Sequence, residues 1–525
     1  MQRGLVVVVV LALVLGGLPS RASAELTGSS GPVVAHGPAG QSVPCTDPLG
    51  AGRRPELGAT LALSEENVGP PAQWGRPVLC LFGFPTEDVY NVVMTGIDNV
   101  EQFRAAKAEA VGKLQGRGID LCKITQWSVW GTPNQPGYTN EDLLSEPLVC
   151  PPRVLSGDDD AGAYLQTARE SVARGLTAGA ADFGWQPDEP IVIIVVTNVD
   201  SAAQVYRRHR SVLETPDVAE QAARQGVSRR YYQYGSSTIY GKIAFINLAD
   251  PNQRTTAKID LEVQRSLSYF GLIRTTGRDP TIPGGNVDNL PEWLRSGLLN
   301  RFQYLHALNG ASGGYLVEAA RAVRNGQTLS LAQLVTAEQS AEAVKQSDPF
   351  VVAARDYVAV AYLYDRFGDA AMRQQLQDLH NRSRADVTGI LTNLTGVDVN
   401  GLDAAVNAWL LERPRFLSAN PEGRLKVEMV TYSDGQHGEV LVDEAAATCL
   451  FDVRSGSTDA NRPGIVGFSV TLGPDGSFTA VRPSTYVGNS VTLTGRVDSG
   501  QLSGTYRVVN EVTGCDGGAI PFGPA

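Results

Sequence analysis

Charged side chains interrupt an otherwise apolar stretch at residues 256–270, TAKIDLEVQRSLSYF. The spacing of its apolar residues predicts a helix. A carboxylate held on such a helix, as at Glu262, can act as a general base that takes a proton from water. Asp260 is two positions away, so the two carboxylates do not share a helical face. Any site built on this helix therefore needs partners from elsewhere in the chain.

Two hypotheses follow for Glu262. A second helix is predicted at 291–307, and its Glu292 can approach Glu262 to give an all-oxygen Ca²⁺ or Mg²⁺ site. Alternatively, Glu262 forms a structural ion pair with Arg265 or Arg295. We favour the ion pair, because nothing else in the sequence supplies ligands for such a metal.

Histidines are few and scattered. The chain has five, no two of them close in sequence and none within 256–271: His36, His209, His306, His380 and His437. No CxxC spacing occurs either, which argues against a cysteine zinc site. The sequence therefore predicts no bound metal and no other cofactor.

A second catalytic pattern is Gly310-Ala311-Ser312-Gly313-Gly314, which matches Gly-x-Ser-x-Gly. A nucleophile elbow needs a strand before the serine and a helix after it. Here a predicted helix ends near Leu308, so the glycines indicate a helix C-cap and a turn between helices.

The chain's charge limits the classes of partner. Its 525 residues carry a net charge of −11, which argues against general affinity for nucleic acid or anionic lipid. Residues 1–24 combine Arg3, an apolar run and Ala22-Ser23-Ala24, as in a cleaved signal peptide. We therefore expect a secreted, extracellular protein with no membrane span after cleavage.

Six cysteines fit that compartment, since an even number in an exported chain indicates disulfides. The position of the last two in one predicted domain suggests a Cys449–Cys515 bond. We expect the other pairs among the four early cysteines: Cys45, Cys80, Cys122 and Cys150.

The predicted elements divide the chain into parts. Residues 25–105 alternate in strand fashion in their second half, whereas 122–152, rich in proline, predicts an ordered loop. Strands at 191–197 and 238–247 follow a helix at 161–176, an α/β order. Residues 256–415 are mostly helical. After a linker at 416–423, residues 424–525 predict an antiparallel β-sandwich or small barrel.

The central part resembles the gluzincin, or thermolysin-like, zinc metallopeptidases. The resemblance covers about residues 161–415: a strand–helix–strand order, a helix entering after AFIN, then WLRSGLLNRF and YVAVAYLYDRFGDAAMRQQL. It implies a metallopeptidase-like domain over 106–415, with an α/β part to about 255 and a helical part after it. The whole chain is then an α+β multidomain protein.

The zinc ligands of that family are missing from the matching positions. On the His-Glu-x-x-His pattern, Leu261 and Arg265 stand where the two histidines belong, and Ser296, in WLRSGL, stands where the third ligand, a glutamate, belongs. Leucine has no lone pair to offer, and arginine is a permanent cation. Only Glu262, at the general-base position, is retained.

The resemblance therefore implies a secreted pseudo-peptidase that acts by binding peptides or envelope components. One alternative is an active extracellular metallopeptidase with a non-standard zinc site. Another is a glycan- or envelope-binding protein that works through its C-terminal β-domain.

Overall fold

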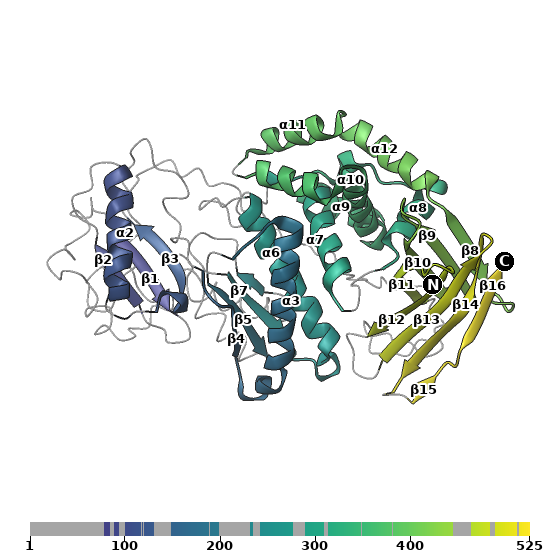
Figure 1. Ribbon diagram of the computed structural model, residues 1–525, viewed down its shortest axis with the longest axis horizontal. Helices are drawn as coiled ribbons and strands as arrows, with labels where there is room; N and C mark the ends of the chain where they lie inside the picture. The colour runs from purple at the N-terminus through teal and green to yellow at the C-terminus, as the bar shows by residue number, and fades with distance from the viewer. Residues whose placement is uncertain are drawn as a thin grey trace, which may run out of the picture. The chain divides into compact units, whose positions relative to one another are not determined.

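The computed structural model describes residues 78–83, 89–93, 100–116, 118, 120–130, 149–187, 190–198, 232–234, 242–276, 289–308, 313–347, 349–380, 382–444, 464–483, 489–511 and 514–524. They belong to two compact units (Figure 1). Unit 1 contains Asn252–Ser268 and Asp288–Ala525, and unit 2 contains Glu25–Pro251 and Tyr269–Val287. The boundary falls inside helix α6, Thr256–Thr276. The expected signal peptide, 1–24, lies outside the described residues.

The N-terminal part of unit 2 contains a three-stranded antiparallel sheet, ordered β2-β1-β3, and one helix. Its strands are β1 (Val78–Gly83), β2 (Val89–Val93) and β3 (Ile124–Trp130), and the helix is α2 (Val100–Gly116). The prediction of a loop across 122–152 is wrong over β3. Its β-branched and aromatic residues suit a strand, and Trp127 pairs with Leu81 on β1.

The rest of unit 2 is an α/β layer with strand order β4-β5-β7-β6. Strands β4 (Arg153–Ser156), β5 (Ile191–Val196) and β7 (Lys242–Asn247) are parallel, and the short β6 (Tyr232–Tyr234) is antiparallel. Every residue of β5 is buried, as its continuous apolar run predicts. Helix α3 (Leu165–Phe183) connects β4 to β5 and packs at its end against Gly271 of α6.

An open cleft of about 360 Å³ lies at the carboxyl end of β4 and is lined by residues 156–159 and by Gly162. Asp158 is one of the lining residues, and its carboxylate is engaged in local hydrogen bonds. It accepts from the backbone N–H of Ala161 at 3.0 Å, from that of Thr197 at 2.7 Å and from that of Asn198 at 3.2 Å. Asp158 therefore fastens the ends of two strands and caps the 3-10 turn that leads into α3.

In the described residues of unit 1, six α-helices follow the first half of α6 along the chain (Figure 1). Gly297 of α7 lets α10 approach closely, because a Cβ there would lie 2.3 Å from the backbone oxygen of Asp356. Gly368, at φ 82°, interrupts α10 with a non-helical conformation that glycine readily adopts. The helices are α7 (Glu292–His306), α8 (Tyr315–Arg324), α9 (Ala337–Gln346), α10 (Pro349–Asp378), α11 (Arg384–Thr395) and α12 (Val399–Glu412).

The C-terminal part of unit 1 is a nearly closed, barrel-like antiparallel sheet of nine strands (Figure 1). Their order is β11-β10-β9-β8-β16-β14-β13-β12, with β15 beside β14. Strand β8 includes residues 416–419, where the composition had predicted a linker. The strands are β8 (Arg415–Ala419), β9 (Leu425–Thr431), β10 (His437–Glu444), β11 (Gly464–Thr471), β12 (Ser477–Pro483), β13 (Asn489–Asp498), β14 (Gln501–Asn510), β15 (Cys515–Asp516) and β16 (Ile520–Pro524).

The helices of unit 1 pack directly on the outer face of the barrel. Gly313 lies very close to Gly467 of β11, since a Cβ on Gly467 would lie 1.3 Å from the carbonyl oxygen of Gly313. Beside this contact, Arg321 of α8 forms ion pairs with Glu428 of β9 at 3.2 Å and with Asp443 of β10 at 3.0 Å. The helical part and the β-part therefore form one packed body in this unit.

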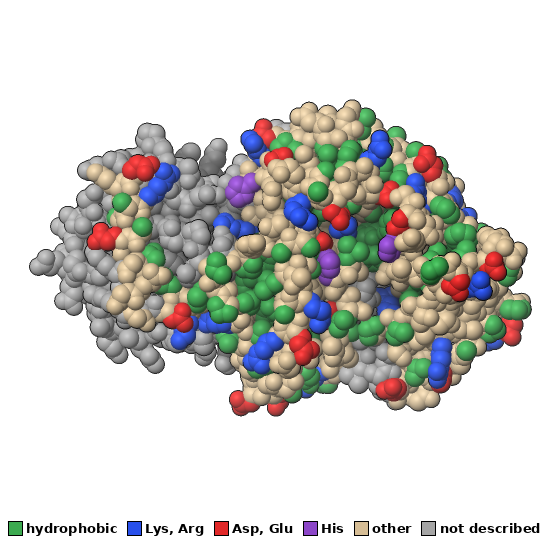
Figure 2. Space-filling view, viewed as in Figure 1, with side chains coloured by type: hydrophobic (Ala, Val, Ile, Leu, Met, Phe, Trp, Pro, Cys, Tyr) green, Lys and Arg blue, Asp and Glu red, His purple; other side chains and the backbone are tan. Residues whose placement is uncertain are grey.

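The disulfides, the absence of a long apolar helix and the surface charge can be compared with the expected extracellular location. Cys122 and Cys150 form a disulfide, which confirms one pair among the four early cysteines. Cys515 is also disulfide-bonded, and Cys449, its expected partner, lies outside the described residues. No helix in the described part of the chain is both long and apolar enough to cross a bilayer. On the face seen in Figure 2, acidic and basic side chains are interspersed over the unit 1 surface.

Candidate functional site

Helix α6 carries an unusual number of buried polar side chains. Its apolar residues are not confined to one face, which agrees with burial on all sides. Polar groups are normally tolerated inside a protein only when they are hydrogen-bonded or form ion pairs. Each must find a partner within the protein, so the helix is the natural place to look for a site. The buried polar residues are Lys258, Asp260, Glu262, Gln264, Arg265, Ser266, Ser268 and Thr276.

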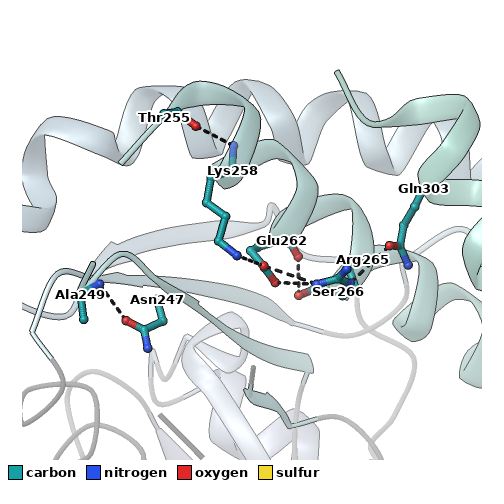
Figure 3. A network of polar contacts seen from close by, with 8 residues as sticks. All are labelled: Asn247, Ala249, Thr255, Lys258, Glu262, Arg265, Ser266 and Gln303. Carbon is teal, nitrogen blue, oxygen red and sulfur yellow. Dashed lines mark hydrogen bonds and ion pairs between the residues drawn. The ribbon is translucent and has the colours of Figure 1, made fainter. Parts of the chain in front are cut away.

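Glu262 lies at the centre of a buried charge network (Figure 3). Its side chain is 3% exposed and forms ion pairs with Lys258, one turn earlier, and with Arg265. The Arg265 Nη1 lies 3.4 Å from each carboxylate oxygen, while its Nε donates to Gln303 of α7 at 3.3 Å. The cluster Lys258–Glu262–Arg265, here called the α6 triad, thus contains two cations for one carboxylate.

The predicted pairing of Glu262 with Arg265 is present, and Lys258 was missed. The signal for Lys258 was available, since a lysine four residues before a glutamate lies on the same helical face. Arg295, the other predicted partner, forms an ion pair with Glu292 on its own helix. Asp260 points to different partners, as its spacing predicts: it accepts from Gln264 at 3.3 Å and from the backbone N–H of Leu308 at 2.6 Å.

Ser296 belongs to a second polar group, between α7 and α10. Its hydroxyl forms hydrogen bonds with Asn300 at 3.4 Å and with the buried carboxyl of Asp356. Burial, reinforced by the nearby charge of Glu292, raises the pKa of Asp356 well above its ordinary range. Among the described residues, no hydrogen-bond partner reaches its Oδ1 atom.

This geometry predicts how stability changes with pH when Asp356 is replaced by asparagine. A raised pKa means that the folded protein favours the neutral acid, so this stabilisation is complete below the ordinary pKa of about 3.9 and is lost as pH rises through the folded value. The free energy of unfolding of Asp356→Asn should therefore rise relative to that of the wild type as the pH increases from 4 to 7.

Urea unfolding followed at several pH values measures this difference. Asp369→Asn, which alters a 73% exposed carboxylate on the same helix, is the control for charge removal alone. An Asp356→Asn curve that runs parallel to the wild type across this pH range would contradict the assignment.

The residues at the family's zinc positions do not fit a zinc ion. Leu261 is partly exposed and has only hydrocarbon to offer, Arg265 brings a cation, and Ser296 is engaged with Asp356. Across the residues that the structure describes, no three His, Cys, Asp or Glu side chains are grouped so that they could hold a metal. We therefore derive no metal-dependent step from these positions.

The Gly-x-Ser-x-Gly stretch lies between α7 and α8, with a helix on each side. Gly314 adopts φ 96° and is the N-cap residue of α8, while Ser312 lies outside the described residues. Helix α7, not a strand, is the described element before the stretch. The predicted glycine C-cap is wrong, because α7 ends at His306 and its C-cap residue is Ala307 in an extended conformation. The predicted turn itself falls on residues 309–312, outside the described part of the chain.

A further buried cluster joins α8 and α10 to the barrel, and sequence reasoning missed it. Glu439 of β10 is fully buried and accepts from the backbone N–H groups of Gly314, at 3.0 Å, and Leu316, at 2.8 Å. It also accepts from Tyr432 at 2.7 Å, whose hydroxyl lies 2.7 Å from that of Tyr357. More than 120 residues separate Glu439 from Gly314 and Leu316, so no local pattern could reveal these contacts.

Comparisons of the chain with protein-family models, with curated proteins and with solved structures gave no match.

Proposed function

We propose that this chain is a secreted, catalytically inactive protein on a metallopeptidase-like frame, and that it acts by binding peptides or cell-envelope components. The observation that carries the proposal is the α6 triad. Glu262 is the one residue of the His-Glu-x-x-His pattern that the sequence retains. Its carboxylate is buried at 3% exposure and is engaged by two cations of its own helix.

Such a carboxylate is poorly suited to general-base catalysis. A general base must reach a water or substrate proton within about 2.6–3.2 Å and must be free to accept it. Here Lys258 and Arg265 donate hydrogen bonds to both carboxylate oxygens and so occupy them. The side chains of Leu261, Arg265 and Ser296 do not suit a zinc ion, so a zinc-bound water is not expected at these positions. The arrangement thus supports a structural role for Glu262 in a non-catalytic protein.

The test combines a hydrolysis assay with a binding assay on the exported protein. Fluorescein-labelled casein peptides are incubated with the wild type and with Glu262→Gln, with and without added zinc. Hydrolysis is followed by chromatography, and binding to the peptides or to a sedimented cell-wall preparation by polarisation and co-sedimentation. We expect binding to one of these targets and no hydrolysis by either protein.

Two results would contradict the proposal. Hydrolysis by the wild type that Glu262→Gln abolishes would indicate an active metallopeptidase with a non-standard site. Absence of binding to both peptides and cell wall would remove the proposed mode of action.

A further inference from the structure

We draw no further inference here: the strongest candidate, the side-chain cluster between α7 and α10 around the buried carboxyl of Asp356, belongs to the polar group already described, and an argument beyond that group would rest on the raised pKa of Asp356 alone.

Discussion

Replacing Glu262 by alanine is expected to lower the free energy of unfolding by about 3–5 kcal/mol, the usual cost of removing one partner from a buried ion pair. The variant would leave Lys258 and Arg265, whose side chains are 7% and 10% exposed, without their shared counter-charge. Chemical denaturation of the wild type and the variant at neutral pH measures the difference. Glu342→Ala, which breaks a similarly spaced but exposed pair with Lys345, should have little effect.

A triple variant sharpens this prediction. Lys258→Met/Glu262→Leu/Arg265→Met replaces the α6 triad by apolar side chains of similar size, which is often neutral or stabilising. It should recover most of the stability that Glu262→Ala loses. A catalytic carboxylate behaves differently, because active-site residues are commonly kept at a cost in stability. If Glu262→Ala leaves stability unchanged or raises it, the structural role of Glu262 is wrong.

Glu439→Ala should destabilise unit 1 to a similar degree, by about 3–5 kcal/mol. The carboxylate accepts from two backbone N–H groups at the start of α8 and from Tyr432, and each buried donor left unsatisfied costs about 1–3 kcal/mol. Thermal and urea unfolding of the purified variant check this. Glu422→Ala, at an exposed position before β9, is the control. Wild-type stability in Glu439→Ala would show that α8 does not depend on this cap.

The pH dependence gives Glu439 a second signature. Burial is the largest influence on its carboxyl and raises the pKa. The folded state therefore favours the protonated acid, and this contribution is complete below the ordinary pKa of about 4.3 and is lost as pH rises through the folded value. The free energy of unfolding of the wild type, relative to that of Glu439→Gln, should therefore be highest at low pH and should fall toward neutral pH.

Sequence patterns predicted the helices and strands whose local preference agrees with their surroundings in the folded protein. The apolar run at β5 and the predicted helix at 291–307 appear in the structure as expected, because burial and periodicity indicate the same element there. Strand β3 was missed because the prolines and tryptophans around it indicated a loop. Its strand state depends on pairing with β1, some 45 residues earlier.

The same limit applies to the polar clusters. The pair Glu262–Arg265 could be predicted because both residues belong to one helix, and Lys258 was within reach of the same argument. Two contacts depend on how helices and strands pack: the contact of Glu439 with α8, and that of Arg482 on β12 with Gly467 on β11. No spacing in the sequence carries that information.

The most direct test of the central claim is the metal content of the mature exported protein, measured by inductively coupled plasma mass spectrometry after purification without chelators. If Leu261, Arg265 and Ser296 have replaced a zinc site and the α6 triad is structural, zinc should be far below one equivalent, and Glu262→Gln should not change it. One equivalent of zinc bound per chain would contradict this account and would require ligands other than those positions.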